Sequence, residues 1–138
     1  MAQGLFTRII ASCQGGGPGS DYEIWSAGIF AADGIPATRE AIETMLQYEI
    51  DLSGHRSKRL DEEMIDNADL VLVMTREHYR YIVEMFGDSK GKTFLLSDLA
   101  GYDGLEIFDP YGLGMEAYQK SAGQIKEMLE KIIEKLAL

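Results

Sequence analysis

The sequence has little cysteine and little histidine, and both shortages narrow the kinds of site that the protein can carry. Its one cysteine, Cys13, excludes an internal disulfide framework and a metal cluster built from several cysteines. The two histidines, His55 and His78, lie too far apart in the sequence to form a local metal motif. We therefore expect no bound metal and no cofactor.

Long apolar runs and an excess of basic residues are also missing. No stretch reaches the roughly 20 apolar residues that a membrane-spanning helix needs, and the first residues have no signal-peptide pattern. We therefore expect a cytoplasmic protein with no membrane partner. Thirteen Lys and Arg against 23 Asp and Glu give a net charge of -10, which repels polyanions, so nucleic acid is not an expected partner either.

What the sequence does contain is a regular alternation of apolar patterns. Leu5, Phe6, Ile9, Ile10 and Cys13 recur at helical spacing, which predicts a helix from the first residues onward. Cys13 ends this stripe and is most simply a small buried hydrophobic residue. The electronegative C-terminal end of a helix does not favour a reactive thiolate.

The rest of the chain predicts further strands and helices in one domain of 138 residues. Strands are expected at Tyr22–Ala27, Leu70–Met74 and Thr93–Leu96. Helices are expected after Thr38, over Asp61–Ala68, after Thr75 and over the C-terminal stretch that ends near Leu136, with loops at Gly15–Gly19, Asp51–Lys58 and Ser97–Gly114. This order predicts an α/β fold with a parallel sheet.

Two glycine-containing stretches are similar to phosphate-binding loops but stand in the wrong order of elements. A phosphate-binding glycine loop follows a strand and opens a helix. Gly15–Gly19 instead follows a helix and leads to a strand, and so does Gly87–Thr93, which reads Gly-x3-Gly-Lys-Thr. We expect a nucleotide site at neither.

The stretch Phe108–Gly112, reading Phe-Asp-Pro-Tyr-Gly and called the acid loop below, is the first candidate for chemistry. Pro110 stiffens the turn and favours an extended backbone at Asp109. An acidic side chain held in this way beside an aromatic one suits proton delivery to a leaving group. Asp-Pro followed by Gly is also ordinary turn chemistry, so both interpretations stand at this point.

Five stretches occur in one order along essentially the whole chain: Met1–Phe6, Ser26–Ala31, Gly54–Ser57, Ala68–Thr75 and Phe108–Gly112. Together they resemble the low-molecular-weight protein-tyrosine-phosphatase family, and more closely its bacterial protein-arginine-phosphatase branch. The resemblance implies a three-layer αβα fold whose four parallel strands lie in the order 2-1-3-4. It also implies hydrolysis of phosphotyrosine or phosphoarginine on proteins, through a cysteinyl-phosphate intermediate.

One part of the family pattern, the loop that carries the nucleophile, has no match in this sequence. The nucleophile of the family lies in a Cys-x5-Arg-Ser-Pro loop after the first strand, ahead of the stretch that matches Met1–Phe6. Cys13 is not followed by that pattern, so we expect an N-terminally incomplete domain over residues 1–138, lacking its first strand and inactive as a phosphatase. The missing strand would lie between strands two and three, leaving unpaired backbone groups or a slot for self-association with a second chain.

Site residues follow from the same resemblance. Asp109 matches the general acid and Tyr111 an aromatic wall of the substrate cleft, while Ser26 and His55 match residues that brace the phosphate loop. The alternatives are a turn aromatic covering the core, a strand-end serine and a surface-loop histidine. Tyr111-Gly112, where eukaryotic members tend to have paired tyrosines, favours the arginine-phosphatase branch.

The expected partner is accordingly a phosphorylated protein. The alternative function is a non-catalytic binding module that uses the vacant slot to accept a partner strand. Arsenate reduction on the same fold requires further cysteines late in the chain, and none follows Cys13.

Overall fold

The computed structural model describes residues 1–13 and 22–136, with the side chain of Cys13 left out. The expected burial of that side chain and the expected loop at Gly15–Gly19 therefore lie outside the described residues. In order, the elements are α1 (Ala2–Cys13), α2 (Arg39–Leu46), α3 (Glu62–Asn67), β1 (Val71–Val73), α4 (Arg76–Met85), the 3-10 helix η1 (Gly87–Lys92), β2 (Thr93–Leu95), α5 (Leu96–Leu99) and α6 (Met115–Leu136). Among these helices, none has the length and apolarity needed to cross a membrane.

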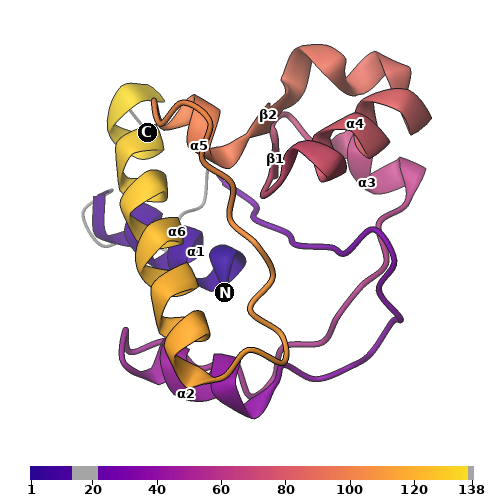
Figure 1. Ribbon diagram of the computed structural model, residues 1–138. Coiled ribbons are helices and arrows are strands. Elements are labelled where there is room, and N and C mark those ends of the chain that lie inside the picture. Colours follow the sequence, from indigo (N-terminus) through magenta and orange to yellow (C-terminus); the bar gives the residue numbers. More distant parts are fainter. Residues whose placement is uncertain (14–21, 137–138) are drawn as a thin grey trace.

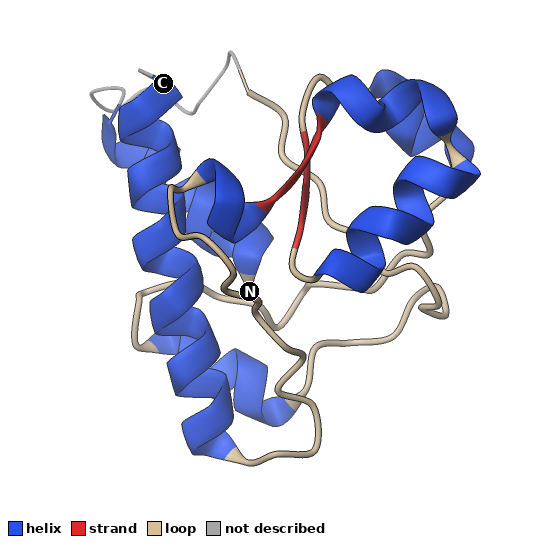
Figure 2. Cartoon of the chain, turned by 45° about the horizontal axis from the view of Figure 1, so that its top comes forward, coloured by secondary structure: helices blue, strands red, loops and turns tan. Residues whose placement is uncertain are grey.

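The two strands form a parallel pair, which confirms the expected α/β class. Val71 pairs with Thr93 and Val73 with Leu95. Figure 1 shows α3 and α4 on one side of the strands and α1, α2 and α6 on the other, an arrangement consistent with three αβα layers. Figure 2 shows the same two strands between these groups of helices.

The expected strand at Tyr22–Ala27 is wrong. Within the described part of the chain the sheet contains β1 and β2, so the order 2-1-3-4 is not completed there. An extended segment becomes a strand only where a neighbouring backbone shares its hydrogen bonds. Such shared hydrogen bonds begin just after this segment, at Gly28. Gly28 N donates to Lys58 O at 3.0 Å, and Gly28 O accepts from Leu60 N at 2.9 Å.

The apolar side chains gather in two clusters. The larger, the helix core, holds twelve buried residues: Leu5, Ala41, Met45, Leu52, Leu96, Ile107, Tyr118, Ala122, Ile125, Met128, Leu129 and Ile132. The smaller, the sheet core, holds Ile65, Val73, Ile82 and Leu95. The apolar stripe expected on the last helix is buried as predicted, except that Leu136 at its end is 41% exposed.

Hydroxyl caps begin two of the helices, as the sequence predicts. Thr38 Oγ1 accepts from Ala41 N at 3.2 Å at the start of α2, and Thr75 Oγ1 accepts from His78 N at 3.2 Å at the start of α4. The long loop expected after Ser97 is shorter than predicted, because α5 occupies Leu96–Leu99. The Leu96 side chain packs into the helix core, where it is 1% exposed, so this turn lies against that core.

The Gly-Lys-Thr stretch has a structural role in this fold. The ammonium group of Lys92 donates to Ile65 O at 2.6 Å and to Ala68 O at 2.7 Å, both at the C-terminal end of α3. Carbonyl groups at a helix end lack partners within the helix and carry partial negative charge, so a cation stabilises them. Lys92 thereby holds α3 against the start of β2.

Candidate functional site

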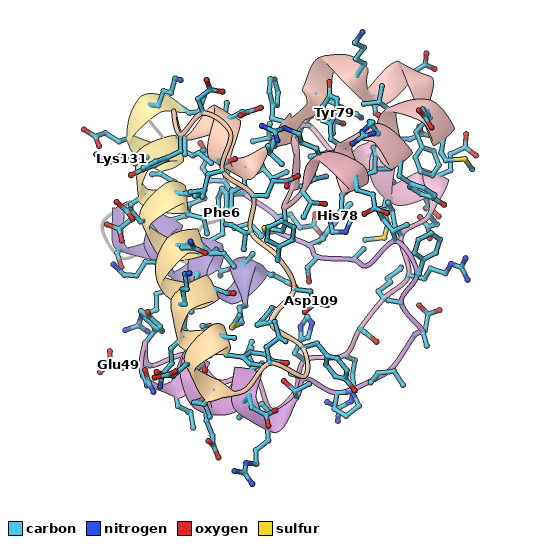
Figure 3. All side chains as sticks on the ribbon, viewed as in Figure 1. Phe6, Glu49, His78, Tyr79, Asp109 and Lys131 are labelled. Carbon is cyan, nitrogen blue, oxygen red and sulfur yellow. The ribbon has the colours of Figure 1, made fainter. Side chains whose placement is uncertain are left out.

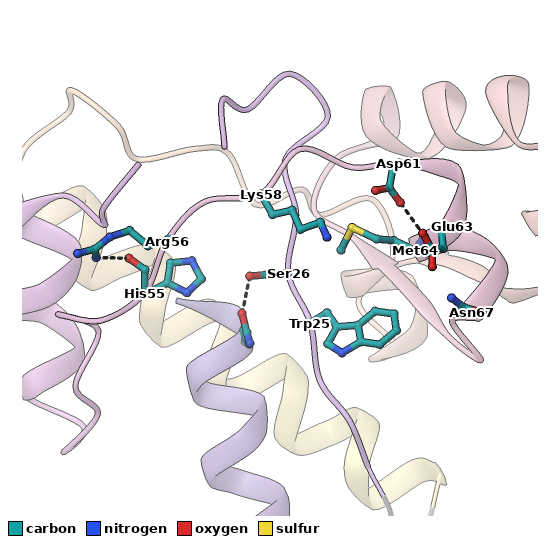
Figure 4. A pocket seen from close by; sticks show the side chains of 10 residues that line it. Trp25, Ser26, His55, Arg56, Lys58, Asp61, Glu63, Met64 and Asn67 are labelled. Carbon is teal, nitrogen blue, oxygen red and sulfur yellow. Dashed lines mark hydrogen bonds between the residues drawn. The ribbon is translucent and has the colours of Figure 1, made fainter. Parts of the chain in front are cut away.

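A cavity of about 390 Å³ opens beside the N-terminal end of α1. Three other segments complete it: the extended stretch before Gly28, the loop before Asp61, and α3 (Figure 4). Its lining residues are Gln3, Trp25, Ser26, His55, Arg56, Lys58, Asp61, Glu63, Met64 and Asn67. Two residues expected from the sequence, Ser26 and His55, therefore meet at one site although they are far apart along the chain.

Ser26 is fixed by α1. Its hydroxyl donates to Gln3 Oε1 at 2.6 Å, while Gln3 Nε2 donates to the carbonyl oxygen of Ile24 at 3.0 Å. Figure 4 draws the contact between the serine and the helix. Sequence reasoning did not single out Gln3, although it lies within the Met1–Phe6 stretch that carries part of the resemblance.

His55 is half-buried at the cavity, and its backbone N donates to Leu52 O at 3.1 Å. Burial lowers the pKa of His55 below its ordinary 6.5, and the positive N-terminal amine and the Arg56 guanidinium lower the pKa further. The imidazole is therefore neutral at neutral pH, with one ring nitrogen free to accept a hydrogen bond.

Two cations, Arg56 and Lys58, line the cavity together with two carboxylates, Asp61 and Glu63. Arg56 Nη1 donates to Ser53 O at 3.1 Å and to His55 O at 2.8 Å, which holds the guanidinium against its own loop. Lys58 is exposed. In the described ranges, neither side chain forms an ion pair. The cationic and anionic side chains that line the cavity therefore balance, so the lining adds no net positive charge of its own.

The acid loop lies elsewhere, between α5 and α6 (Figure 3). Of its described residues, neither Asp109 nor Tyr111 lines the cavity. The Asp109 carboxylate is exposed and accepts from Tyr111 N at 3.0 Å. Tyr111 is 71% exposed, so it does not cover the core. The structure therefore brings Ser26 and His55 together and leaves Asp109 and Tyr111 as a separate, exposed pair.

The residues that line the cavity determine which chemistry the described part of the chain can perform. Arg56 and Lys58 are suited to holding an anion, whereas the single O–H of Ser26 is already donated to Gln3 Oε1. Covalent catalysis requires a nucleophile, and α1 carries Cys13 away from the cavity: it lies ten positions after Gln3 along the helix, a rise of about 15 Å. Within residues 1–13 and 22–136, no group of three or more His, Cys, Asp and Glu side chains is placed to hold a metal ion.

Comparison with known proteins identifies one family. A family model described as "Low molecular weight phosphotyrosine protein phosphatase" matches residues 1–138. The protein-arginine-phosphatase of Bacillus subtilis (strain 168) is 32% identical over 136 residues, covering 99% of this chain and 87% of that protein. A probable low molecular weight protein-tyrosine-phosphatase, EpsP, of Ralstonia solanacearum is 34% identical over 126 residues, covering 91% and 79%.

A solved structure gives the same result at the level of the fold. The low molecular weight protein tyrosine phosphatase from T. tengcongensis matches with a TM-score of 0.86 and 38% sequence identity, covering 97% of this chain and 88% of that chain. The resemblance found from five sequence stretches is thereby confirmed for the family and the fold. The relatives include phosphatases of both arginine and tyrosine residues, so they share a hydrolytic activity and differ in the phosphorylated residue.

Proposed function

Because this chain belongs to the low molecular weight phosphotyrosine protein phosphatase family, we propose that it serves the hydrolysis of phosphotyrosine or phosphoarginine on cytoplasmic proteins. The observation that carries the proposal is the cavity at the start of α1, where Ser26 and His55 lie beside Arg56 and Lys58. In this proposal Arg56 and Lys58 contact the phosphate group locally, beside the Asp61 and Glu63 carboxylates, and Ser26 and His55 brace a phosphate-binding loop.

Asp109 takes the role of general acid in the proposed reaction. In the family mechanism a cysteine thiolate attacks phosphorus, and the departing oxygen or nitrogen takes a proton from the aspartic acid. The P–O or P–N bond breaks as the S–P bond forms. Water, deprotonated by the same carboxylate, then releases phosphate from the cysteine. Tyr111 would form an aromatic wall beside the substrate.

The 138 residues are proposed not to perform this reaction by themselves. Cys13 is the one cysteine, and the residue at the arginine position of a Cys-x5-Arg pattern would be Gly19. A positioned acid contributes about 10² to 10⁴ in rate, but only to a phosphate that is already bound and attacked. Purified protein should therefore hydrolyse para-nitrophenyl phosphate no faster than buffer. Turnover that survives Cys13→Ser would contradict this.

A synthetic peptide added in trans tests the phosphatase proposal itself. The peptide carries an apolar strand followed by Cys-x5-Arg-Ser-Pro, and its control carries Ser in place of Cys. We expect the cysteine peptide to produce turnover with the 138-residue protein and the serine peptide to produce none. Asp109→Asn should lower that turnover by about 10² to 10⁴, whereas Asp103→Asn, in an exposed turn nearby, should leave it unchanged.

Comparison of phosphorylated peptides then addresses the substrate class. The small residue Gly112 after Tyr111 supports the arginine-phosphatase branch, so phosphoarginine peptides should be hydrolysed faster than phosphotyrosine peptides of the same sequence. The reverse order would place the protein with the tyrosine phosphatases while leaving the phosphatase proposal intact.

The second candidate function is a non-catalytic binding module, and the backbone of β1 favours it. β1 pairs with β2 along one edge, and nearby the stretch before Gly28 is extended without being part of the sheet. Extended backbone with free N–H and C=O groups can accept a strand from a partner. Binding of the serine peptide, with no hydrolysis in the presence of the cysteine peptide, would favour this function over the first.

A further inference from the structure

Three consecutive residues fix the segment just before the acid loop to the elements around the C-terminal end of β1. Leu105 O accepts from the hydroxyl of Ser97 on α5. The Glu106 carboxylate accepts from Arg76 N at 2.7 Å, and Ile107 N donates to Met74 O at 3.0 Å. These contacts bring the segment to the C-terminal end of β1, where parallel sheets of this class carry their ligand sites.

Glu106 makes the contact that depends on a side chain. Arg76 is the first residue of α4, so its backbone N–H has no partner within the helix. Thr75 caps the same helix through His78 N, two residues further along, and Glu106 satisfies the first amide from outside the helix. A carboxylate at a helix N-terminus is also favoured by the helix dipole.

After Ile107 the chain leaves the core, and its hydrogen bonds become local. Ile107 is 4% exposed and belongs to the helix core, whereas Phe108 is 67% exposed. The hydrogen bonds in and just after the acid loop are local: Tyr111 N donates to Asp109 Oδ1 and Leu113 N donates to Pro110 O, each at 3.0 Å. The loop thus keeps its own shape, and its place relative to β1 is set by the docked segment before it.

We infer that Glu106 is a positioning residue for Asp109, tying the acid loop to the start of α4 at the end of β1. The inference rests on the proposed acid role of Asp109. Glu106 touches no substrate in this scheme; it acts by restricting where the carboxylate three residues later can lie. Such placement matters because a general acid works only within hydrogen-bond reach of the leaving atom.

Amide hydrogen exchange measured by NMR on the 138-residue protein tests the inference without requiring turnover. Glu106→Ala removes the acceptor, and Glu106→Asp keeps the charge but shortens the side chain by one methylene. Glu106→Gln keeps the length and an acceptor oxygen. Asp103→Ala is the matched control, because it removes an exposed carboxylate from the same loop. The carbon-13 signal of the Asp109 carboxyl is the second readout.

We expect Glu106→Ala and Glu106→Asp to speed exchange of the Ile107 amide, which donates to Met74 O, by about tenfold and to shift the Asp109 signal. Glu106→Gln and Asp103→Ala should stay near the wild type. Unchanged exchange at Ile132, in the buried stripe of α6, reports an intact fold. If the alanine variant unfolds, the aspartate variant decides.

Faster exchange at Arg76, with exchange at Ile107 and the Asp109 signal unchanged, would show that Glu106 only caps α4 and would overturn the inference. The outcome for the proposed function is separate. If exchange changes as expected but Asp109→Asn leaves peptide-induced turnover unaffected, then Glu106 does position the acid loop and Asp109 is not the general acid.

Discussion

At the scale of single residues, Lys92 shows how a motif-like string can serve the fold. The sequence excluded a nucleotide loop here because the stretch leads from a helix into a strand. The structure gives the physical counterpart, since the ammonium group lies among carbonyl oxygens at the end of α3. The sequence could not have predicted that use, because Lys92 and Ile65 are distant along the chain.

Replacing Lys92 with Met should lower the free energy of unfolding by roughly 1.5 to 3 kcal/mol, the usual cost of losing hydrogen bonds to a charged group. Methionine keeps an unbranched apolar side chain but offers no donor to Ile65 O and Ala68 O. Urea denaturation measures the change. Lys90→Met, on the exposed surface of η1, is the control; an equal loss in both variants would contradict the role of Lys92.

His55 makes stability depend on pH in a defined direction. Its pKa is lowered in the folded protein, chiefly by burial, below the ordinary 6.5. Between the two pKa values the unfolded chain binds more protons, so the free energy of unfolding falls as pH drops through 6.5 and recovers as pH rises.

Urea denaturation between about pH 7.5 and pH 5.5 should show this slope in the wild type and a flatter one in His55→Gln. Equal slopes in the wild type and His55→Gln would remove His55 as the cause.

At the scale of elements, helices were predicted better than strands, and the reason is physical. A helix satisfies its own backbone, so the cap residues Thr38 and Thr75 and the apolar spacing of α6 were enough to place it. A strand depends on a neighbour. Tyr22–Ala27 has the alternation of a strand but joins no ladder in the described structure, and no local pattern could have revealed this.

Thr38 offers a test of how a cap serves more than its own helix. Its Oγ1 accepts from Ala41 N at 3.2 Å and donates to the hydroxyl of Tyr118 on α6 at 3.1 Å. Thr38→Ala should therefore cost about 1 to 2 kcal/mol in urea denaturation, and Thr38→Ser should cost much less. If serine and alanine destabilise equally, the loss belongs to the methyl group.

At the scale of the whole molecule, the candidate site was predicted in parts and not as an assembly. The sequence resemblance named Ser26, His55, Asp109 and Tyr111, and the fold brings the first two to one cavity. Their meeting could not be read from spacing, because it depends on Gln3 holding the stretch that contains Ser26. Arg56 and Lys58 were missed for a related reason: a charged residue in a polar loop gives no signal until its neighbours are known.

Net charge supplies a prediction at the same scale. With a charge of -10, the folded chain repels itself, and salt screens that repulsion. The urea midpoint at neutral pH should therefore rise when sodium chloride is increased from about 0.01 M to about 0.15 M. Potassium chloride should have the same effect, since screening depends on ionic strength. A midpoint that falls with both salts would contradict self-repulsion as the dominant long-range term.

The two hydrophobic clusters meet at a single peptide bond. Leu95 belongs to the sheet core and Leu96 to the helix core, so two consecutive side chains pack into different hydrophobic clusters. One inserted or deleted residue there would turn a leucine out of its cluster. The turn around Asp103 is exposed and is not constrained by packing in this way. Over the history of this lineage, changes in chain length should collect in that turn and be eliminated at the junction of β2 with α5.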